Sequence, residues 1–215
     1  MRRLVVRGTL TVLASILCLA PAGLQASTLL SENFNELTPS LAVASAGAFH
    51  TIDGTNVDIV GGSLFGYLCA SPESGNCIDM DGSGGNSQGI LQSNSTFTLD
   101  PGVTYHLSFD LIGSQRGITA STTVTFGPYS QTFVLASSND TSGIVSNQVV
   151  TVSVPTTTFL TFTSNTPGDV GNLLDNVLLT SGSTTRVPEP SSLLLLSLAL
   201  LGLGVVTRLR RVVDQ

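Results

Sequence analysis

The sequence predicts an all-β domain, a jelly roll or β-sandwich, and three observations support this prediction. Residues from Val103 to Leu111 alternate apolar with polar side chains, the period of a strand that buries one face. Other short runs rich in Val, Thr and Phe are separated by Gly, Ser, Asn and Asp. No stretch between residues 27 and 181 has a convincing helical period. Many short strands between turns are typical of two packed sheets.

The expected strands follow the chain in order. Asp100-Pro101-Gly102 predicts a turn before the alternating strand, and Gly127-Pro128 predicts a hairpin turn. The alternation places Tyr105 in the core and His106 on the outer face. The expected strands are Leu29–Phe34, Val57–Val60, Cys77–Met80, Ser95–Leu99, Val103–Leu111, Ser121–Phe126, Gln131–Ala136, Gln148–Val154, Thr158–Thr163 and Leu173–Leu179.

The N-terminal segment, residues 1–26, has the features of a secretory signal peptide. Three arginines precede an apolar run from Leu10 to Ala20, and a small residue, Ala26, stands before the expected cut at Ser27. The apolar run is short for a membrane span of about 20 residues, which favours a cleaved leader over an uncleaved anchor. The domain proper is therefore expected at 27–181.

The C-terminal segment is also apolar, and its parts come in a fixed order. A linker at 182–187 leads into Pro188-Glu189-Pro190, which bars a regular helix. Residues Leu193–Val206 are then expected to form a short hydrophobic helix, about 21 Å long against a hydrocarbon core of about 30 Å. Three arginines between 208 and 211 would stay cytoplasmic by the positive-inside rule, with the domain on the other side.

Charge is scarce and one-sided in the domain. Charged residues make up 10% of the chain, and all eight basic residues are arginines. Only Arg116 and Arg186 fall between residues 27 and 186, against twelve acids, a net charge of −10 for that segment. Such a surface repels nucleic acid and anionic headgroups, and it suits divalent cations or neutral partners such as glycans.

Two cysteines remain once the leader, with Cys18, is removed. Cys69 and Cys77 form an even pair in an oxidising compartment, which favours a structural disulfide. Two free thiols or a redox pair are the alternatives, although the spacing is not that of a C-x-x-C motif.

The ordered triple at the C-terminus, from Val187 to Arg211, resembles the PEP-CTERM sorting signal of Gram-negative bacteria. The resemblance implies export through the Sec machinery, recognition by an exosortase and removal of the helix after transient inner-membrane anchoring. It also implies a place in the cell envelope, on the outer surface or outside the cell, in association with extracellular polysaccharide and biofilm. An ordinary C-terminal membrane anchor is the alternative.

The domain resembles a group of PEP-CTERM exoproteins that have a carbohydrate-binding-like jelly roll. This sequence departs from the group in having no Trp, and Phe49 stands near the position where an aromatic Trp is frequent. That departure weakens any expectation of sugar stacking. The matching pieces are residues 57–62, 78–83, 107–111 with 113–116, and 173–177.

Calcium is the one cofactor that these features suggest. Jelly-roll binding modules often hold a structural Ca²⁺ between their first and last strands, and Glu32 with Asp175 would be the ligands here if those strands pair. Solvated edge acids are the alternative. The stretch from Asp79 to Asn86 superficially resembles a calcium loop, but Ile90 replaces the bidentate Glu of an EF-hand, so a polar turn is the better interpretation.

Tyr67, Arg116 and Tyr129 are the candidates for contacts with a glycan. No motif marks a nucleophile, a catalytic carboxylate pair or a histidine metal site. The sequence therefore predicts an exported, non-enzymatic surface or matrix protein with a glycan-associated domain. A structural or adhesive exoprotein without a specific ligand is the second hypothesis, and a polysaccharide hydrolase is the third.

Overall fold

The computed structural model describes residues 26–62, 64, 66, 69, 75–85, 88–138 and 144–182. The first 25 residues of the expected signal peptide and the expected sorting tail lie outside this part. Within it, no helix is long and apolar enough to cross a membrane.

The strands are β1 Ser27–Glu32, β2 Ser40–Val43, β3 Ser45–Ala46, β4 Phe49–Thr51, β5 Val57–Val60, β6 Cys77–Asp79, β7 Ile90–Ser93, β8 Phe97–Leu99, β9 Tyr105–Ile112, β10 Ala120–Phe126, β11 Tyr129–Leu135, β12 Ile144–Val150, β13 Thr156–Thr158, β14 Leu160–Ser164 and β15 Leu173–Ser181.

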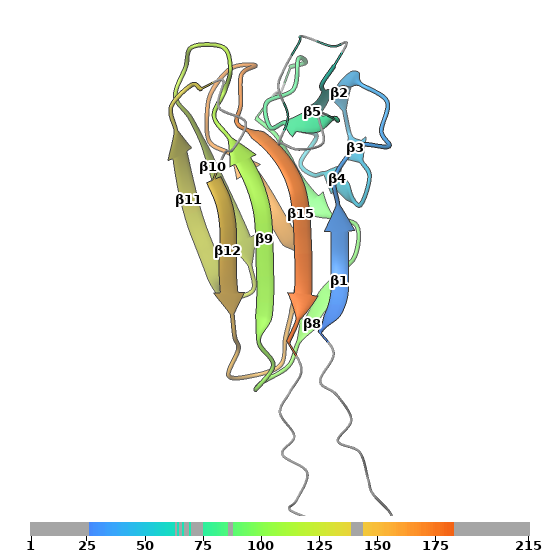
Figure 1. The fold of residues 1–215 in the computed structure, drawn as a ribbon, viewed down its shortest axis with the longest axis vertical. Coiled ribbons are helices and arrows are strands. Elements are labelled where there is room, and N and C mark those ends of the chain that lie inside the picture. The colour runs from blue at the N-terminus through green and yellow to red at the C-terminus, as the bar shows by residue number, and fades with distance from the viewer. Residues whose placement is uncertain are drawn as a thin grey trace, which may run out of the picture.

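These strands form two antiparallel sheets, which confirms the prediction of an all-β sandwich (Figure 1). One sheet has the order β12-β9-β15-β6-β5-β2, and β1 pairs with β15 beside this path. The other has the order β11-β10-β14-β7-β4-β3, and β13 with β8 makes a small third sheet. The predicted turn at Gly127-Pro128 is confirmed, because Phe126 pairs with Tyr129 in the β10–β11 hairpin.

The first and last strands lie side by side (Figure 1). Ser27 pairs with Ser181, so both ends of the domain leave from the same end of the sandwich. The opposite end, at the top of Figure 1, holds the start of β15 and the loops around it. We call it the distal end.

The core lies between the two main sheets and is rich in phenylalanine. Phe109 of β9 meets Phe162 of β14 edge-on with 5.3 Å between ring centres, and Phe162 meets Phe49 of β4 at 6.0 Å. Each such side chain contributes about 1.5–3 kcal/mol through its burial. The predicted orientation of β9 is confirmed: Tyr105 is buried and His106 is exposed.

Four strands of the structure were not predicted: β2, β3, β4 and β7. They are only two to four residues long, too short for an alternation to stand out, and pairing with neighbours holds them in place. The expected strand Thr158–Thr163 is divided between two sheets. Thr156–Thr158 pairs with β8, whereas Leu160–Ser164 pairs with β10 and β7.

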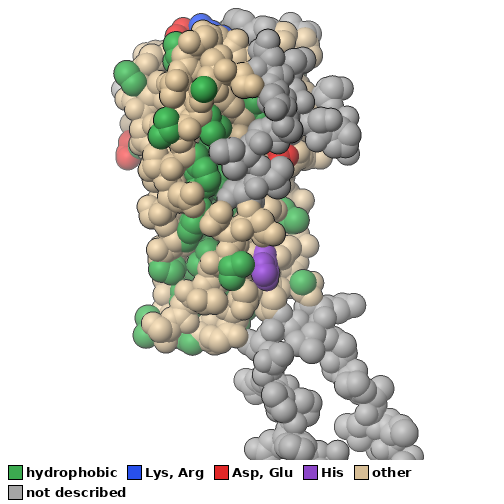
Figure 2. Space-filling model, turned by 60° about the vertical axis from the view of Figure 1, so that its left-hand side comes forward, with side chains coloured by type: hydrophobic (Ala, Val, Ile, Leu, Met, Phe, Trp, Pro, Cys, Tyr) green, Lys and Arg blue, Asp and Glu red, His purple; other side chains and the backbone are tan. Residues whose placement is uncertain are grey.

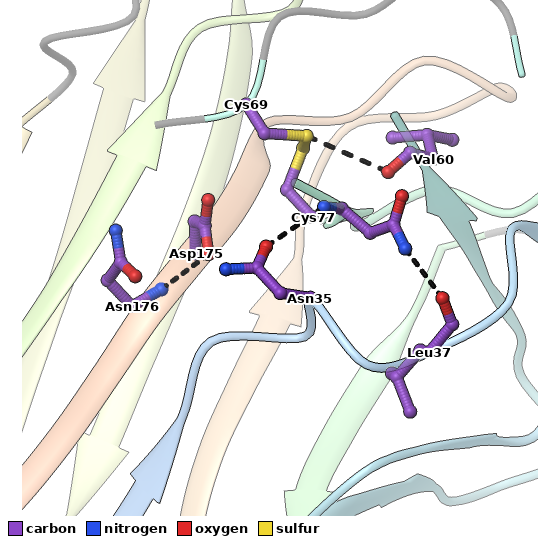
Figure 3. Close-up of a disulfide and its surroundings, with 8 residues drawn as sticks. Asn35, Leu37, Val60, Cys69, Cys77, Asp175 and Asn176 are labelled. Atoms are coloured by element: carbon purple, nitrogen blue, oxygen red, sulfur yellow. Dashed lines mark hydrogen bonds between the residues drawn. A yellow bond between two sulfur atoms is a disulfide. The ribbon is translucent and has the colours of Figure 1, made fainter. Parts of the chain in front are cut away.

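A disulfide joins Cys69 to Cys77, as the sequence predicted (Figure 3). Cys77 begins β6 and is fully buried, and Cys69 lies beside Val60 at the end of β5. Asn76 is the residue before Cys77, and its backbone amide donates a hydrogen bond to Asn35 Oδ1 at 3.1 Å. The bridge and this hydrogen bond together hold Cys69 and Asn76 against the body of the sandwich.

A half-buried contact between Glu32 and the turn at Gly47 fixes the end of β1. The two carboxylate oxygens of Glu32 accept hydrogen bonds from the amides of Phe34 and Ala48, at 2.9 and 2.8 Å. Gly47 has φ +59, and a side chain added there would overlap this carboxylate. Glycine at residue 47 is therefore required both by its backbone conformation and by Glu32.

Replacing both bridged cysteines by alanine is expected to lower the free energy of unfolding by about 2.5 kcal/mol, because the short loop then gains conformational freedom when the chain unfolds. Urea unfolding of the exported protein and its double variant measures this. Reduction of the wild type should give the same loss, and equal stability with and without the bridge would contradict the prediction.

Gly47→Ala is expected to destabilise the domain more than Gly102→Ala does. Both positions have positive φ, which costs a side chain about 1–2 kcal/mol. Only Gly47 lies against another group, since a side chain at Gly102 meets open space. Thermal unfolding should therefore give a lower melting temperature for Gly47→Ala than for Gly102→Ala. Equal melting temperatures would show that the Glu32 side chain moves aside without loss of stability.

Candidate functional site

Loops from both sheets meet at the distal end. There β9 ends at Ile112, β10 begins at Ala120, β14 ends at Ser164 and β15 begins at Leu173. The segment after β6 joins them, because Leu173 pairs with Asp79 and Asp81 forms a bridge with Gln88. Residues that are far apart in the sequence are thus brought to one end of the sandwich.

A cavity of about 440 Å³ opens at this end. The described part of its lining has hydroxyl and amide groups but no charged side chain. The residues that line it are Thr55, Gln88, Ile90, Thr163, Ser164, Pro167 and Gly168.

Three carboxylates lie buried close to this cavity. Asp58, Asp79 and Asp81 each expose 2% or less of their surface. Among the described residues no salt bridge reaches any of them; the ion pair found there joins Arg116 to Asp169, at 3.7 Å on the surface. A buried carboxylate without a cation needs hydrogen bonds, a metal ion or a proton to be tolerated.

Asp58 and Asp79 obtain hydrogen bonds from the backbone. Asp58 Oδ1 accepts from the amides of Ala42 at 2.7 Å and Ser83 at 2.9 Å, and its Oδ2 accepts from the Ser83 hydroxyl. Asp79 Oδ1 accepts from the amides of Asp81 at 3.1 Å and Gly171 at 2.8 Å. These two side chains organise the loops around them.

The charged forms of Asp79 and Asp81 are nevertheless disfavoured. Burial raises the pKa of Asp79 to about 7, against the lowering effect of the two amides, and the carboxylates of Asp81 and Asp58 raise it further. Burial likewise raises the pKa of Asp81 to about 6, and nearby Asp169 adds to the rise. The Ser164 hydroxyl and the Gly89 amide lower it, but neither makes a hydrogen bond of normal geometry with Asp81.

The predicted calcium ligands lie on neighbouring strands, because Glu32 of β1 pairs with Val177, two residues beyond Asp175 in β15. Glu32 already accepts two backbone amides, and Asp175 is buried and accepts the amide of Asn176 at 2.8 Å. Asp175 lies near Asn35 and the disulfide (Figure 3). The described residues contain no group of three or more His, Cys, Asp or Glu placed to share a metal. Calcium at Glu32 and Asp175 stays a prediction.

The predicted glycan contacts are not brought together. Arg116 precedes β10 at the distal end, whereas Tyr129 follows the turn at the other end of that strand. The Tyr129 hydroxyl donates to Gln131 on its own strand, at 3.1 Å. Tyr67 lies outside the described residues.

Sequence reasoning missed the distal cavity and treated Asp81 as part of a polar turn. The Asp79-x-Asp81 spacing was the available signal, but it did not reveal that Asp81 is buried. Asn172, whose side chain is also fully buried, had no signal in the sequence. Its side chain donates a hydrogen bond to Thr122, which lies fifty residues away in the sequence.

Comparisons with solved structures find distant likenesses. The K1 cleaved adhesin domain of Lys-gingipain from Porphyromonas gingivalis W83 is 15% identical over 71% of this chain and 97% of that one, with a TM-score of 0.43. Isomalto-dextranase of Arthrobacter globiformis T6 complexed with panose is 15% identical, with a TM-score of 0.37 over 66% of this chain and 22% of that one. The CBM22-1–GH10 modules of Clostridium thermocellum xylanase 10B, complexed with xylohexaose, are 13% identical over 74% and 29%, with a TM-score of 0.33. Nothing about a ligand is inferred from these likenesses.

The sequence comparisons concern the tail. No curated protein matches the chain. Residues 186–211 match the family model of the PEP-CTERM protein-sorting motif, and this match contains Pro188-Glu189-Pro190. The chain therefore carries a PEP-CTERM sorting motif after its β-sandwich, and this motif marks it as an exported protein that an exosortase recognises.

Proposed function

We propose that this protein is a non-enzymatic component of the cell envelope or extracellular matrix, and that its distal cavity binds a neutral polysaccharide segment. The observation that carries the proposal is the uncharged, polar lining of the cavity. Thr55, Gln88, Thr163 and Ser164 offer hydroxyl and amide groups of the kind that hydrogen-bond sugar hydroxyls. The volume of about 440 Å³ falls within the range of small-ligand sites, about 300–1,000 Å³.

Two further features support a neutral and weakly bound ligand. The net charge of −10 between residues 27 and 186 disfavours acidic polymers, including nucleic acid. The lining residues that the structure describes include no aromatic ring for stacking on a sugar, and Tyr129 lies at the other end of β10. Binding would thus depend on hydrogen bonds and on many copies of the protein along a polymer.

The non-enzymatic part of the proposal is supported by the chemistry of the lining. Glycoside hydrolysis needs two carboxyl groups that reach the substrate. Among the described residues that line the cavity there is no carboxylate, imidazole or thiol, and Asp81 has no exposed surface. Asp58 and Asp79 are committed to backbone amides, as described above.

The placement of the cavity fits a protein that is sorted by its C-terminus. The chain enters and leaves the domain at Ser27 and Ser181, and the cavity lies at the distal end, roughly 26 Å away along β15. A tail held in the membrane would therefore leave the cavity directed away from it.

A structural or adhesive role without a specific ligand is the second candidate, and the edge strands favour it. β11 and β12 are the outer strands of their sheets, and Val134 and Val149 on them are 66% and 62% exposed. Figure 2 shows hydrophobic side chains scattered over the face on this side and few charged ones. Uncharged edges of this kind favour contact between sheets of different molecules.

Replacing Pro188-Glu189-Pro190 by three alanines is expected to stop processing, because the exosortase reads this motif. The wild-type protein should have a new C-terminus within the tail, whereas the variant should keep the tail and stay in the inner-membrane fraction. Mass spectrometry of the C-terminus and cell fractionation measure both. Thr184→Ala in the linker is the control, and normal processing of the triple variant would contradict the sorting role.

Gln88→Ala is expected to weaken binding of neutral polysaccharides by about tenfold, the effect of losing one or two hydrogen bonds. A glycan array probed with the exported protein, followed by titration of the best polymer, measures this. Gln131→Ala, at the other end of the sandwich, is the matched control. Absence of binding across the array would leave the adhesive role, and release of shortened sugars would overturn the non-enzymatic proposal.

A further inference from the structure

Asp81 is the exception among the buried carboxylates near the cavity. It is fully buried, and neither of its oxygens has a hydrogen-bond partner among the residues that the structure describes. Oδ1 of Asn172 is in the same state: the residue is fully buried and this oxygen is unpartnered. All three of these atoms are acceptors, so hydrogen-bond donors or a cation are needed to satisfy them.

A closed series of contacts brings Asp81 and Asn172 to one place. The amide of Met80, next to Asp81, donates to the carbonyl of Asn172 at 3.0 Å. Asn172 Nδ2 donates to Thr122 Oγ1 at 3.1 Å. Thr122 pairs with Ser164 across β10 and β14, and Ser164, whose Oγ accepts from the Thr166 amide at 3.3 Å, lies close enough to Asp81 to lower the pKa of its carboxyl. The unpartnered oxygens therefore lie within one buried polar cluster that bridges the two sheets.

Gly171 shows how closely the chain must approach to build this cluster. A side chain at Gly171 would meet the Asp81 nitrogen at 2.6 Å and Asp79 Oδ1 at 2.8 Å. Since the Asp81 nitrogen is backbone, it has little freedom to move. The loop before β15 is thus pressed against Asp81, which places Asn172 beside it.

We propose that this cluster is a calcium site, with the Asp81 carboxylate and Asn172 Oδ1 as ligands and the hydroxyls of Ser164 and Thr122 beside them. Every donor is an oxygen, the ligand type that hard cations require. A buried water would offer only two protons to three acceptors, and it would leave the charge of Asp81 uncompensated. Asp79, two residues away, holds the surrounding backbone in place by accepting the amides of Asp81 and Gly171.

Ca²⁺ fits this set better than Mg²⁺ does. Calcium accepts six to eight oxygen ligands in irregular arrangements, whereas magnesium demands near-ideal octahedral geometry. Ser164 belongs both to the cluster and to the lining of the cavity, so the ion would enter from the cavity and water there would complete its coordination. The site differs from the one predicted at Glu32, whose two oxygens already accept backbone amides.

The test is calcium binding by the exported protein after removal of metal with EDTA. Elemental analysis and calorimetric titration with CaCl₂ should give one ion per chain, and the ion should raise the melting temperature. Asp81→Asn, which keeps the shape of the side chain, should weaken binding by about 100-fold and abolish the rise. Asn172→Ala should weaken it less, and Asp100→Asn, at an exposed turn, should leave it unchanged.

Three results would overturn the proposal. They are no calcium bound at millimolar concentration, equal binding by wild type and Asp81→Asn, or loss of binding in Glu32→Gln but not in Asp81→Asn. Without calcium, Asp81→Asn should melt no lower than the wild type, because it removes an uncompensated buried charge; this keeps the variant folded for the comparison. Glycan binding is measured separately, so failure of either proposal leaves the other standing.

Discussion

The packing of two sheets through a phenylalanine core is the constraint on which the rest of this structure depends. Phe109 comes from one sheet, and Phe49 and Phe162 come from the other, so their contacts join the two layers. Burial of these faces fixes the register of each strand, because a shift of one residue would turn every core side chain outward. With the register fixed, the loops at each end are also fixed.

The ends of the sandwich are where its polar chemistry collects. A core of apolar faces leaves no place for Asp81, Asn172, Thr122 and Ser164 except at the margin, where strands end and loops cover the core. There these four residues are buried, but they are not surrounded by apolar side chains on every side. The result is a cluster in which hydrogen bonds satisfy most atoms and three oxygens are left over.

The same arrangement separates anchoring from recognition. β1 and β15 are neighbours, so both chain ends leave from one end of the domain, and the cavity and the buried acids occupy the other. The disulfide and the Glu32–Gly47 contact add to the short strand pairings of the region between β1 and β6.

The sequence by itself determined the fold class, the longer strands, the disulfide and the sorting tail. Each of these is a local signal: an alternation such as that of β9, a pair of cysteines, or the order of a Pro-Glu-Pro motif, an apolar run and arginines. Local signals could not give the short strands β2, β3, β4 and β7, because a strand of two to four residues is held by its neighbours and not by its own pattern. Nor could they show that Arg116 and Tyr129 lie at opposite ends of β10, or that the Asn172 carbonyl accepts from the amide of Met80, next to Asp81. Only the tertiary structure decided these points, because the residues are separated by many positions in the chain and burial is a property of the packed sheets.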